Sequence, residues 1–304
     1  MLIRQAAFAK KGTFLKGNMH CHTMLSDGRA SANSVIRQYD DMGYDFLALT
    51  DHQRYNFTNH APGTDLLILP GIEEDRFLDG KGMPVLHVVG VGPEEGNGYT
   101  DGEPVHYQRG GTADECQDII DNIRAAGNLA ILCHPMWSGN TVEEIKALQD
   151  FQMIEVWNTG SAVFWGVDNN TYHWDVLLHE GRRVWAVASD DGHDLHQNGY
   201  GWVRVNAEKN TPSILKALEN GEFYASCGPE IYDFYVEDGR VCISCSPVSQ
   251  ILLRNFSCPH RMLRGENMTG GQFQLRDLCT DYIRAEVVDA QGRRAWTQPI
   301  FLDD

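Results

Sequence analysis

Short apolar segments that end in histidine or a carboxylate recur along this chain, and they constrain its fold more than any other feature. Segments with helical spacing lie between them, such as residues 113–126. The polar side chains at the ends of these strand-like segments are His20, His22, Asp51, His52, Glu73, His134, Asp191 and His193. In parallel α/β folds, the carboxyl ends of the strands meet at one edge. We therefore expect residues far apart in sequence to share one cleft.

The segment GNMHCHTMLSDG carries the first pair of histidines. His20 and His22 are two residues apart, so on an extended backbone both side chains point to the same side and can bind one metal ion. Asp27 follows, and His87 lies within the segment LHVVGVG rather than at its end. Nitrogen and oxygen ligands together suit zinc, manganese or iron(II). Because the ligands outnumber those that one ion needs, we expect two or three divalent ions.

Strand and helix signals alternate up to about residue 225. Such repeated βα units imply a parallel sheet and, in a chain of this size, often a barrel. After residue 225 the segments alternate polar and apolar residues or carry turn residues, without long helices between them. We predict an α/β domain over residues 1–225 and a small antiparallel, β-sandwich-like domain over residues 226–304.

Composition limits the partners of the protein. The net charge is −17 over 304 residues, which argues against an extensive nucleic-acid surface or binding to anionic membranes. No apolar run approaches the roughly 20 residues of a membrane span. The opening MLIRQAAFAKKGTF lacks the features of a signal peptide. We expect a cytoplasmic protein that binds no membrane.

Eight cysteines are scattered through the chain. The CxxC pair Cys242 and Cys245 could join Cys258 and Cys279 in a four-thiolate zinc site. However, CISC sits in a strand-like run, where positions three apart point to opposite faces. We therefore predict packed thiols in this segment.

Taken together, the motifs resemble those of the PHP (polymerase and histidinol phosphatase) superfamily of metal-dependent phosphoesterases. The matching segments are, in order, His20-Cys21-His22 with Asp27-Gly28, Thr50-Asp51-His52, Gly71-Ile72-Glu73, Cys133-His134-Pro135 and Asp191-Gly192-His193. This resemblance covers the first two thirds of the chain and implies a distorted (β/α)7 barrel. The C-terminal segment YASCGPEIYDFYVEDG makes the whole similar to the CehA/McbA-like branch.

The resemblance also implies a distribution of the ligands among three ions. One ion would be bound by His20, His22 and Asp191. Glu73 would bridge it to a second ion, bound by His87 and His134. A third site would consist of Asp27, His52 and His193, where Asp27 replaces the histidine of several relatives.

Metal-activated hydroxide at such a centre predicts hydrolysis of a phosphate ester. His193 or Asp51 could transfer a proton, although His193 is also a candidate ligand and Asp51 could instead orient a ligand. Arg54, two residues after His52, is the candidate clamp for the phosphate. Trp137 and Trp165 could line a pocket for a ring. The substrate class is a small phosphomonoester, such as a mononucleotide or sugar phosphate, with a short oligonucleotide left open.

Two other functions compete with this interpretation. A metal hydroxide also attacks carbonyl groups, so a metal-dependent amidohydrolase or a carboxyl or carbamate esterase is the first alternative. The second is an inactive, metal-stabilised binding module, against which the near-complete ligand set argues. The sequence contains neither a GxSxG elbow nor a GxxxxGK[ST] loop.

Overall fold

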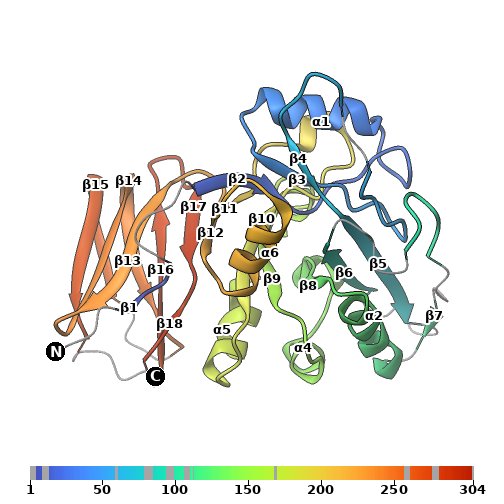
Figure 1. Cartoon of the computed structure of the whole chain (residues 1–304). Helices are drawn as coiled ribbons and strands as arrows, with labels where there is room; N and C mark the ends of the chain where they lie inside the picture. Colours follow the sequence, from blue (N-terminus) through green and yellow to red (C-terminus); the bar gives the residue numbers. More distant parts are fainter. Residues whose placement is uncertain are drawn as a thin grey trace.

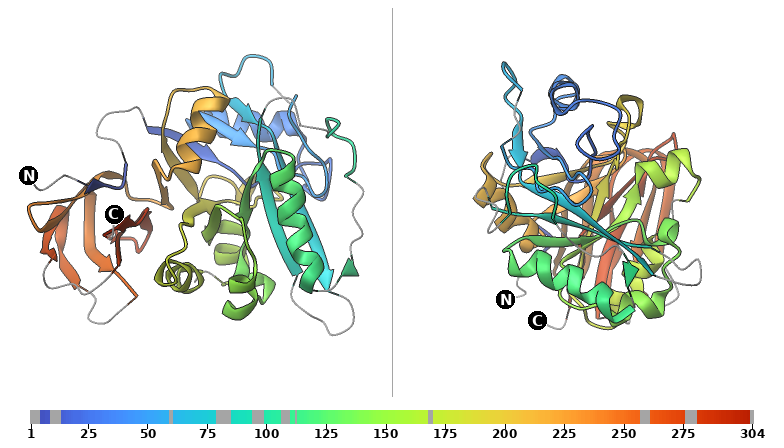
Figure 2. Two further views of the ribbon diagram at one scale, coloured as in Figure 1. Left: turned by 60° about the horizontal axis from the view of Figure 1, so that its bottom comes forward. Right: turned by 90° about the vertical axis from the view of Figure 1, so that its right-hand side faces the viewer.

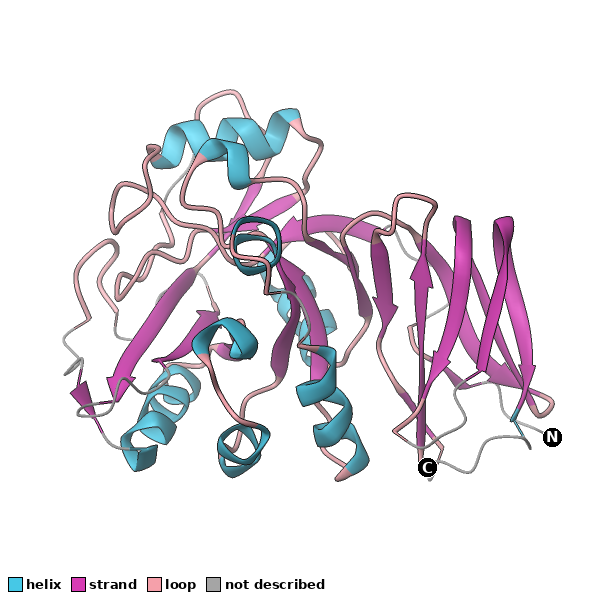
Figure 3. Cartoon of the chain, turned by 180° about the vertical axis from the view of Figure 1, so that it is seen from behind, coloured by secondary structure: helices cyan, strands magenta, loops and turns pink. Residues whose placement is uncertain are grey.

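A computed structural model describes most of the chain, and its strands form two sheets (Figure 1). The described residues are 5–8, 14–58, 61–78, 85–93, 99–105, 110–111, 113–167, 170–256, 261–275 and 281–302. Helices pack around the half that contains the polar strand ends, whereas strands dominate the C-terminal half (Figure 3). Both termini lie at the C-terminal half (Figure 1).

The half with the polar strand ends alternates strands and helices. In chain order its elements are β2 (Phe14–Asn18), α1 (Ala32–Asp41), β3 (Phe46–Ala48), β4 (Leu67–Leu69), β5 (Gly71–Leu78), β6 (Val85–Val91), β7 (Gly110–Gly111), α2 (Ala113–Ala125), β8 (Leu129–Leu132), α3 (Pro135–Ser138), α4 (Val142–Ala147), β9 (Met153–Asn158), a π-helix (Gly160–Phe164), α5 (Thr171–His179), β10 (Trp185–Ser189), a 3-10 helix (Leu195–Gln197), β11 (Trp202–Asn206) and α6 (Thr211–Glu219).

The remaining strands belong to the C-terminal half. They are β12 (Phe223–Ser226), β13 (Ile231–Glu237), β14 (Arg240–Arg254), β15 (Arg261–Gln274), β16 (Tyr282–Val288), β17 (Arg294–Thr297) and β18 (Ile300–Phe301), joined by the N-terminal β1 (Gln5–Ala6), which pairs with β13. Neighbouring strands among β12 to β18 pair antiparallel. The predicted antiparallel extension is therefore confirmed.

The structure confirms the predicted α/β fold but does not show the predicted parallel barrel among the described residues. One sheet has the order β10-β9-β8-β6-β5-β7, while β2, β3 and β4 end the other, twelve-stranded sheet. Among the described residues no continuous ladder closes these strands into a barrel; isolated bridges Cys21–Gly192 and His52–Glu73 join the two sheets. Strand β6 also runs antiparallel to both β5 and β8, which the βα pattern did not predict.

Backbone hydrogen bonds between strands join the two halves. Strand β12 pairs with β11 on one side and with β17 on the other, so the twelve-stranded sheet passes through the predicted boundary near residue 225. A partly buried ion pair adds to this link, because Arg284 of β16 donates from Nε and Nη2 to the Asp175 carboxylate of α5, both at 2.7 Å. Whether residues 1–225 and 226–304 are separate domains stays a prediction.

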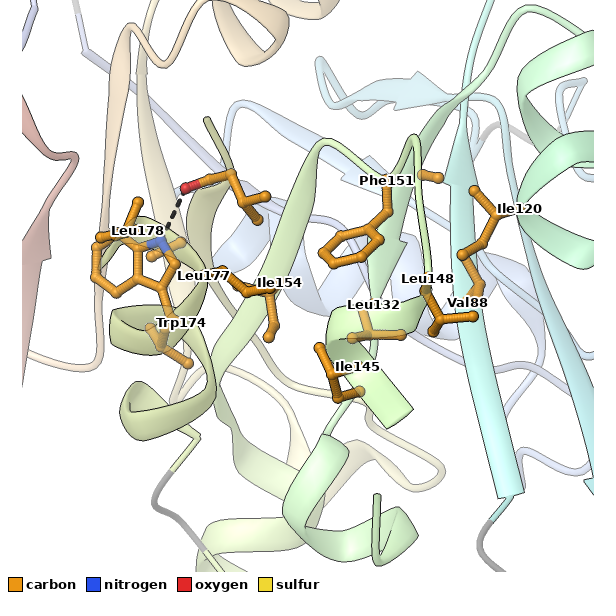
Figure 4. Packing of buried hydrophobic residues seen from close by; sticks show 14 of the residues in the cluster. Val88, Ile120, Leu132, Ile145, Leu148, Phe151, Ile154, Trp174, Leu177 and Leu178 are labelled. Carbon is orange, nitrogen blue, oxygen red and sulfur yellow. Dashed lines mark hydrogen bonds between the residues drawn. The ribbon is translucent and has the colours of Figure 1, made fainter. Parts of the chain in front are cut away.

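The hydrophobic core explains why the helices form where they do. Helix α2 lies along β5 and β6 (Figure 2) and buries Ile119, Ile120 and Ile123, whose spacing follows the helical repeat. Trp174 of α5 is buried in the same cluster and donates from Nε1 to the Val184 carbonyl at 2.8 Å (Figure 4). This packing fixes the strands whose ends carry the polar side chains.

Two further sequence expectations concern the cysteines and the membrane. Cys242 and Cys245 are buried in β14 with free thiols, as expected for packed strand cysteines, while Cys258 and Cys279 lie outside the described residues. In the described part of the chain, no helix has the length and apolar character needed to cross a membrane.

Candidate metal centre

The HxH segment places two imidazoles side by side directly after β2. Its extended backbone is fixed by hydrogen bonds: the Cys21 amide donates to Thr50 Oγ1 at 3.1 Å, and the His22 amide donates to the Gly192 carbonyl at 3.0 Å. As predicted from the spacing, the side chains of His20 and His22 point to the same side, with their Nε2 atoms 3.2 Å apart. Both side chains are almost fully buried.

Glu73 occupies the middle of the centre. Its carboxylate is 1% exposed and lies among the nitrogens of five imidazoles. The distances are 3.2 Å from Oε1 to His20 Nε2, 2.9 Å to His87 Nδ1 and 3.7 Å to His134 Nε2, and from Oε2 they are 3.2 Å to His22 Nε2 and 3.1 Å to His52 Nδ1. One carboxylate thus joins side chains that follow three different strands and one that lies within β6.

His87 reaches this edge because β6 is antiparallel. Carboxyl ends of parallel strands meet at one edge, so a residue near the amino end of an antiparallel neighbour lies at that same edge. His87 is the third residue of β6 and pairs with Asp75 of β5, two residues beyond Glu73. The sequence left His87 as the exception among the strand ends, and the direction of β6 explains it.

Asp191 joins the first pair of histidines from the end of β10. Its Oδ1 lies 3.2 Å from His20 Nε2 and 3.1 Å from His22 Nε2. The other carboxylate oxygen accepts a hydrogen bond from Asn158 Nδ2 at 3.1 Å. His20, His22, Glu73 and Asp191 thus form one compact, buried group.

A second group lies nearer to solvent. The Asp27 side chain is 56% exposed, and its oxygens lie 3.4 Å from His193 Nε2, 3.6 Å from His22 Nδ1 and 3.8 Å from His52 Nε2. The rings of His22 and His193 stack with centroids 4.1 Å apart. This arrangement brings together the three residues of the expected third site, with His22 beside them.

The electrostatic balance of the centre favours added positive charge. Burial opposes protonation of His20, but the carboxylates of Asp191 and Glu73 raise the pKa of that imidazole well above its usual value. Burial is likewise outweighed at His22, where the same two carboxylates raise the pKa to about 10. Burial would raise the pKa of Glu73, yet the surrounding imidazoles, first that of His20, hold it well below its usual range. Protons or divalent cations can supply the charge that these carboxylates attract.

Hydrogen bonding shows that lone pairs converge in the buried group. Because Glu155 can only accept when ionised, His20 Nδ1 carries a proton in their 2.8 Å hydrogen bond, so in the neutral imidazole the lone pair is on Nε2. That lone pair faces oxygens of Glu73 and Asp191 at 3.2 Å each. Such convergence of acceptors is unfavourable without a cation and is typical of metal ligands.

The distances between these side chains also fit metal binding. Two ligands of one zinc-sized ion, each about 2.1 Å from it, lie about 3.0–3.4 Å apart, which matches the separations of 3.1–3.2 Å within the buried group. In addition, His52 Nδ1 and Glu73 Oε2 are buried without a hydrogen-bond partner. The residues therefore fit divalent metal ions.

The structure groups the second set of ligands differently from the expectation. His52, Glu73 and His87 each have a possible ligand atom within 4.8 Å of those of the other two. His134, which the resemblance places with His87, lies farther away, with Nε2 at 3.7 Å from Glu73 and 3.8 Å from Asp191. His52 therefore faces both the second and the third expected sites, while His134 lies between the first and the second.

Glu155 is the residue that sequence reasoning undervalued. It sits in β9, buried, and accepts hydrogen bonds from His20 Nδ1, the His134 amide and Asn158 Nδ2, each at 2.8 Å, and from Ser189 Oγ. A carboxylate that fixes the ring orientation and tautomer of a ligating histidine is a common feature of metal sites. The available signal was a carboxylate at the third position of the otherwise uncharged strand MIEVWN.

Asp51 holds the loop that carries Asp27. Its carboxylate accepts from Thr23 N and Oγ1, from Ser26 N and Oγ, and from Asn56 Nδ2, at 2.7–3.2 Å. Both oxygens are thus occupied by fixed donors, which favours the orienting role over proton transfer.

The Asp190 carboxylate is likewise occupied by hydrogen bonds. It accepts from Tyr39 Oη, Thr159 Oγ1 and the amides of residues 199–201. Asp191 rather than Asp190 therefore faces the other candidate ligands.

A cleft of about 550 Å³ opens onto the more exposed group. Its lining residues are Leu25, Ser26, Asp27, His52, Gln53, Arg54, Asp75, His87, Pro104 and Trp137. Arg54 is half-buried in this wall and donates from Nη1 to the Gly102 carbonyl at 2.7 Å. The expected phosphate clamp therefore stands beside the candidate ligands. Arg29 instead points to Asp194, at 3.8 Å, and is exposed.

Comparisons with known proteins give distant matches among solved structures. No family model matches the chain, and no curated protein does. Among solved structures, a two-domain protein from Bacteroides vulgatus described as containing a predicted PHP-like metal-dependent phosphoesterase matches with a TM-score of 0.49 and 14% identity, over 95% of this chain and 96% of that one. A metal-dependent phosphoesterase from Bifidobacterium adolescentis (TM-score 0.44, 13% identity, 58% and 87% covered) and an amidohydrolase from Chromobacterium violaceum (0.41, 18%, 59% and 87%) also match.

The chain resembles the PHP superfamily. Two of these matched proteins carry phosphoesterase names, one of them PHP-like, whereas none of the three names the CehA/McbA-like branch. Since all three TM-scores are below 0.5, the function of this chain has to be inferred from the residues of the candidate metal centre.

Proposed function

We propose that this protein is a metal-dependent phosphoesterase, built on a PHP-type scaffold, that hydrolyses a small phosphomonoester. The main support for this proposal is the position of the Glu73 carboxylate, which lies within 3.7 Å of five imidazole nitrogens. The ligands would be His20, His22, Glu73, His87, His134 and Asp191 in the buried part, and Asp27, His52 and His193 nearer to the cleft.

Divalent ions bound here would lower the pKa of a bound water and stabilise the negative charge that develops on the phosphoryl group. The protein's own residues prepare that chemistry. Glu155 fixes the ring of His20, and Asp51 fixes the loop of Asp27 through the hydrogen bonds described above. Arg54 stands in the cleft wall, where its guanidinium can bind a phosphate oxygen.

His193 is the candidate for proton transfer. Its Nδ1 lies 3.0 Å from the Asp191 carbonyl, which only accepts, so Nδ1 carries the proton and Nε2 carries the lone pair. The side chain is 34% exposed, so Nε2 can exchange protons with solvent or substrate. The same atom lies 3.4 Å from Asp27 and is equally placed to bind an ion.

A substrate panel tests this function directly. The purified protein is stripped with a chelator, reloaded with zinc, manganese or iron(II), and offered phosphomonoesters, nucleotides, short oligonucleotides and carbonyl esters. We expect metal-dependent release of inorganic phosphate. The variant Glu73→Gln should lose it, and Glu219→Gln, an exposed carboxylate on α6, should retain it.

Each alternative gives a different result in this panel. Hydrolysis of carbonyl esters or amides alone would show an esterase or amidohydrolase instead. Full metal occupancy without turnover of any substrate would support the binding module. Release of phosphate without dependence on metal would contradict the assignment of the centre.

A further inference from the structure

Trp137 forms part of the cleft wall directly beside the candidate ligands. It belongs to α3, the short helix that follows His134, and its side chain is 39% exposed. The indole contacts His134 edge to face, with ring centroids 4.9 Å apart, and its centroid lies 6.0 Å from that of His87. One side of the ring is thus packed against the centre, while the exposed part faces the cleft that it lines.

The short helix α3 is held in place by its neighbours, so this indole has a defined position. The Met136 amide donates to Asn170 Oδ1 at 2.9 Å, and His134 Nδ1 lies 3.0 Å from Ser138 Oγ. Gly139 ends the helix in the left-handed conformation, with φ of 73°. A side chain that is already ordered loses little entropy when a ligand packs against it.

The rest of the cleft favours a substrate with an apolar part over a polyanion. Leu25 and Pro104 add apolar surface, and Leu25 is 41% exposed. Among the described side chains of the lining, Arg54 is the only lysine or arginine, whereas Asp27 and Asp75 are acidic. The cleft of about 550 Å³ lies within the range of small-molecule pockets, about 300–1,000 Å³, which leaves room for more than a phosphate group.

We propose that Trp137 is a specificity residue, and that the substrate is a phosphate ester whose alcohol carries a planar aromatic or heteroaromatic ring. This inference rests on the function proposed above. The phosphate binds at the ions and Arg54, and the ring packs against the exposed part of the Trp137 indole. Offset or edge-to-face contact between two rings is favourable beyond the area that it buries.

A matched pair of substrates isolates this contact. Propyl phosphate and 2-phenylethyl phosphate are both primary alkyl phosphates with similar leaving groups, and only the second carries a ring. The kinetics of metal-loaded wild type, Trp137→Ala, Trp137→Phe and Trp165→Ala are measured on both. Trp165 is a suitable control because its side chain is 71% exposed and is not part of the cleft lining.

We expect wild type to prefer 2-phenylethyl phosphate. Trp137→Ala should lower kcat/KM for this substrate about 5- to 100-fold, mainly through KM, and leave propyl phosphate unchanged, in line with the energy of stacking a base on an aromatic side chain. Trp137→Phe should restore part of the loss, and Trp165→Ala should behave as wild type. The metal content of each variant is measured in parallel.

Three results would overturn the inference. These are equal turnover of both substrates by wild type, equal loss on both substrates in Trp137→Ala, and a fall in metal content of Trp137→Ala that accounts for its loss of activity. Hydrolysis of neither phosphate by metal-loaded wild type would instead refute the proposed function, and the ring-bearing phosphate substrate with it.

Discussion

Glu155→Gln tests whether the buried carboxylate in β9 orients the first metal ligand. The two oxygens of Glu155 accept four hydrogen bonds, from His20 Nδ1, the His134 amide, Asn158 Nδ2 and Ser189 Oγ. Glutamine keeps one oxygen and replaces the other with an NH2 group, which only donates. Whichever way the amide turns, two of the four donors lose their acceptor.

The expected losses of metal affinity and of stability in Glu155→Gln follow from these contacts. If the amide turns its NH2 group to His20, the ring loses the hydrogen bond that holds its proton on Nδ1 and its lone pair on Nε2. Loss of such an orienting partner weakens metal binding about 10- to 100-fold, which is about 1.4–2.7 kcal/mol of binding free energy. Each buried donor left without a partner also destabilises the fold by about 1–3 kcal/mol.

Metal affinity is measured by competition with a chromogenic chelator, and bound metal by mass spectrometry. The exposed Glu219→Gln is the control for the loss of one negative charge, and thermal unfolding of the metal-free proteins separates weakened binding from a damaged fold. Wild-type affinity for every ion in a folded Glu155→Gln would refute the idea that this carboxylate orients His20.

Three further perturbations address other parts of the structure. His20→Ala should lose one ion and most turnover while the protein still folds, as measured by metal analysis, kinetics and circular dichroism; full activity would contradict the ligand scheme. Asp51→Asn should loosen the loop of Asp27 and lower the number of ions bound without removing any ligand, and unchanged metal content would exclude this positioning role. Asp175→Asn removes the carboxylate that accepts two hydrogen bonds from the buried Arg284, and leaves Glu286 at 3.8 Å as its acidic neighbour. Urea unfolding should therefore show a loss of about 1.5–3 kcal/mol; a loss below about 1 kcal/mol would show that the pair contributes no more than an exposed one.

The sequence predicted that most of these side chains would lie close together, because side chains at the ends of strands need only the strand order to be brought together. His20 and His22 required nothing beyond the period of an extended chain. Asp191 required only that β10 end at the same edge as β2. Glu73 is instead the third residue of β5, and the structure places both carboxylates within 3.2 Å of His20.

The features that the sequence did not explain depend on pairing between strands. His87 lies beside the carboxyl end of β8 because β6 runs antiparallel to β8, and no local pattern encodes that direction. The importance of Glu155 arises from the contacts of β9 with its neighbours β8 and β10 in the sheet, which bring the His134 amide and Ser189 to its oxygens. The barrel was expected from the βα repeat, which counts elements but does not determine whether a ladder closes.

The position of β12 between β11 and β17 has a practical consequence for anyone who wishes to express the metal-binding half alone. A chain cut after residue 225 would shorten β12 and leave its amides and carbonyls without the partner strand β17. Exposed strand edges of this kind favour pairing between copies of a protein. Trp296 and Tyr282, which belong to the same hydrophobic cluster as Trp174, would also be removed. The truncated chain should therefore aggregate, and residues 1–225 should need the C-terminal strands to remain in solution.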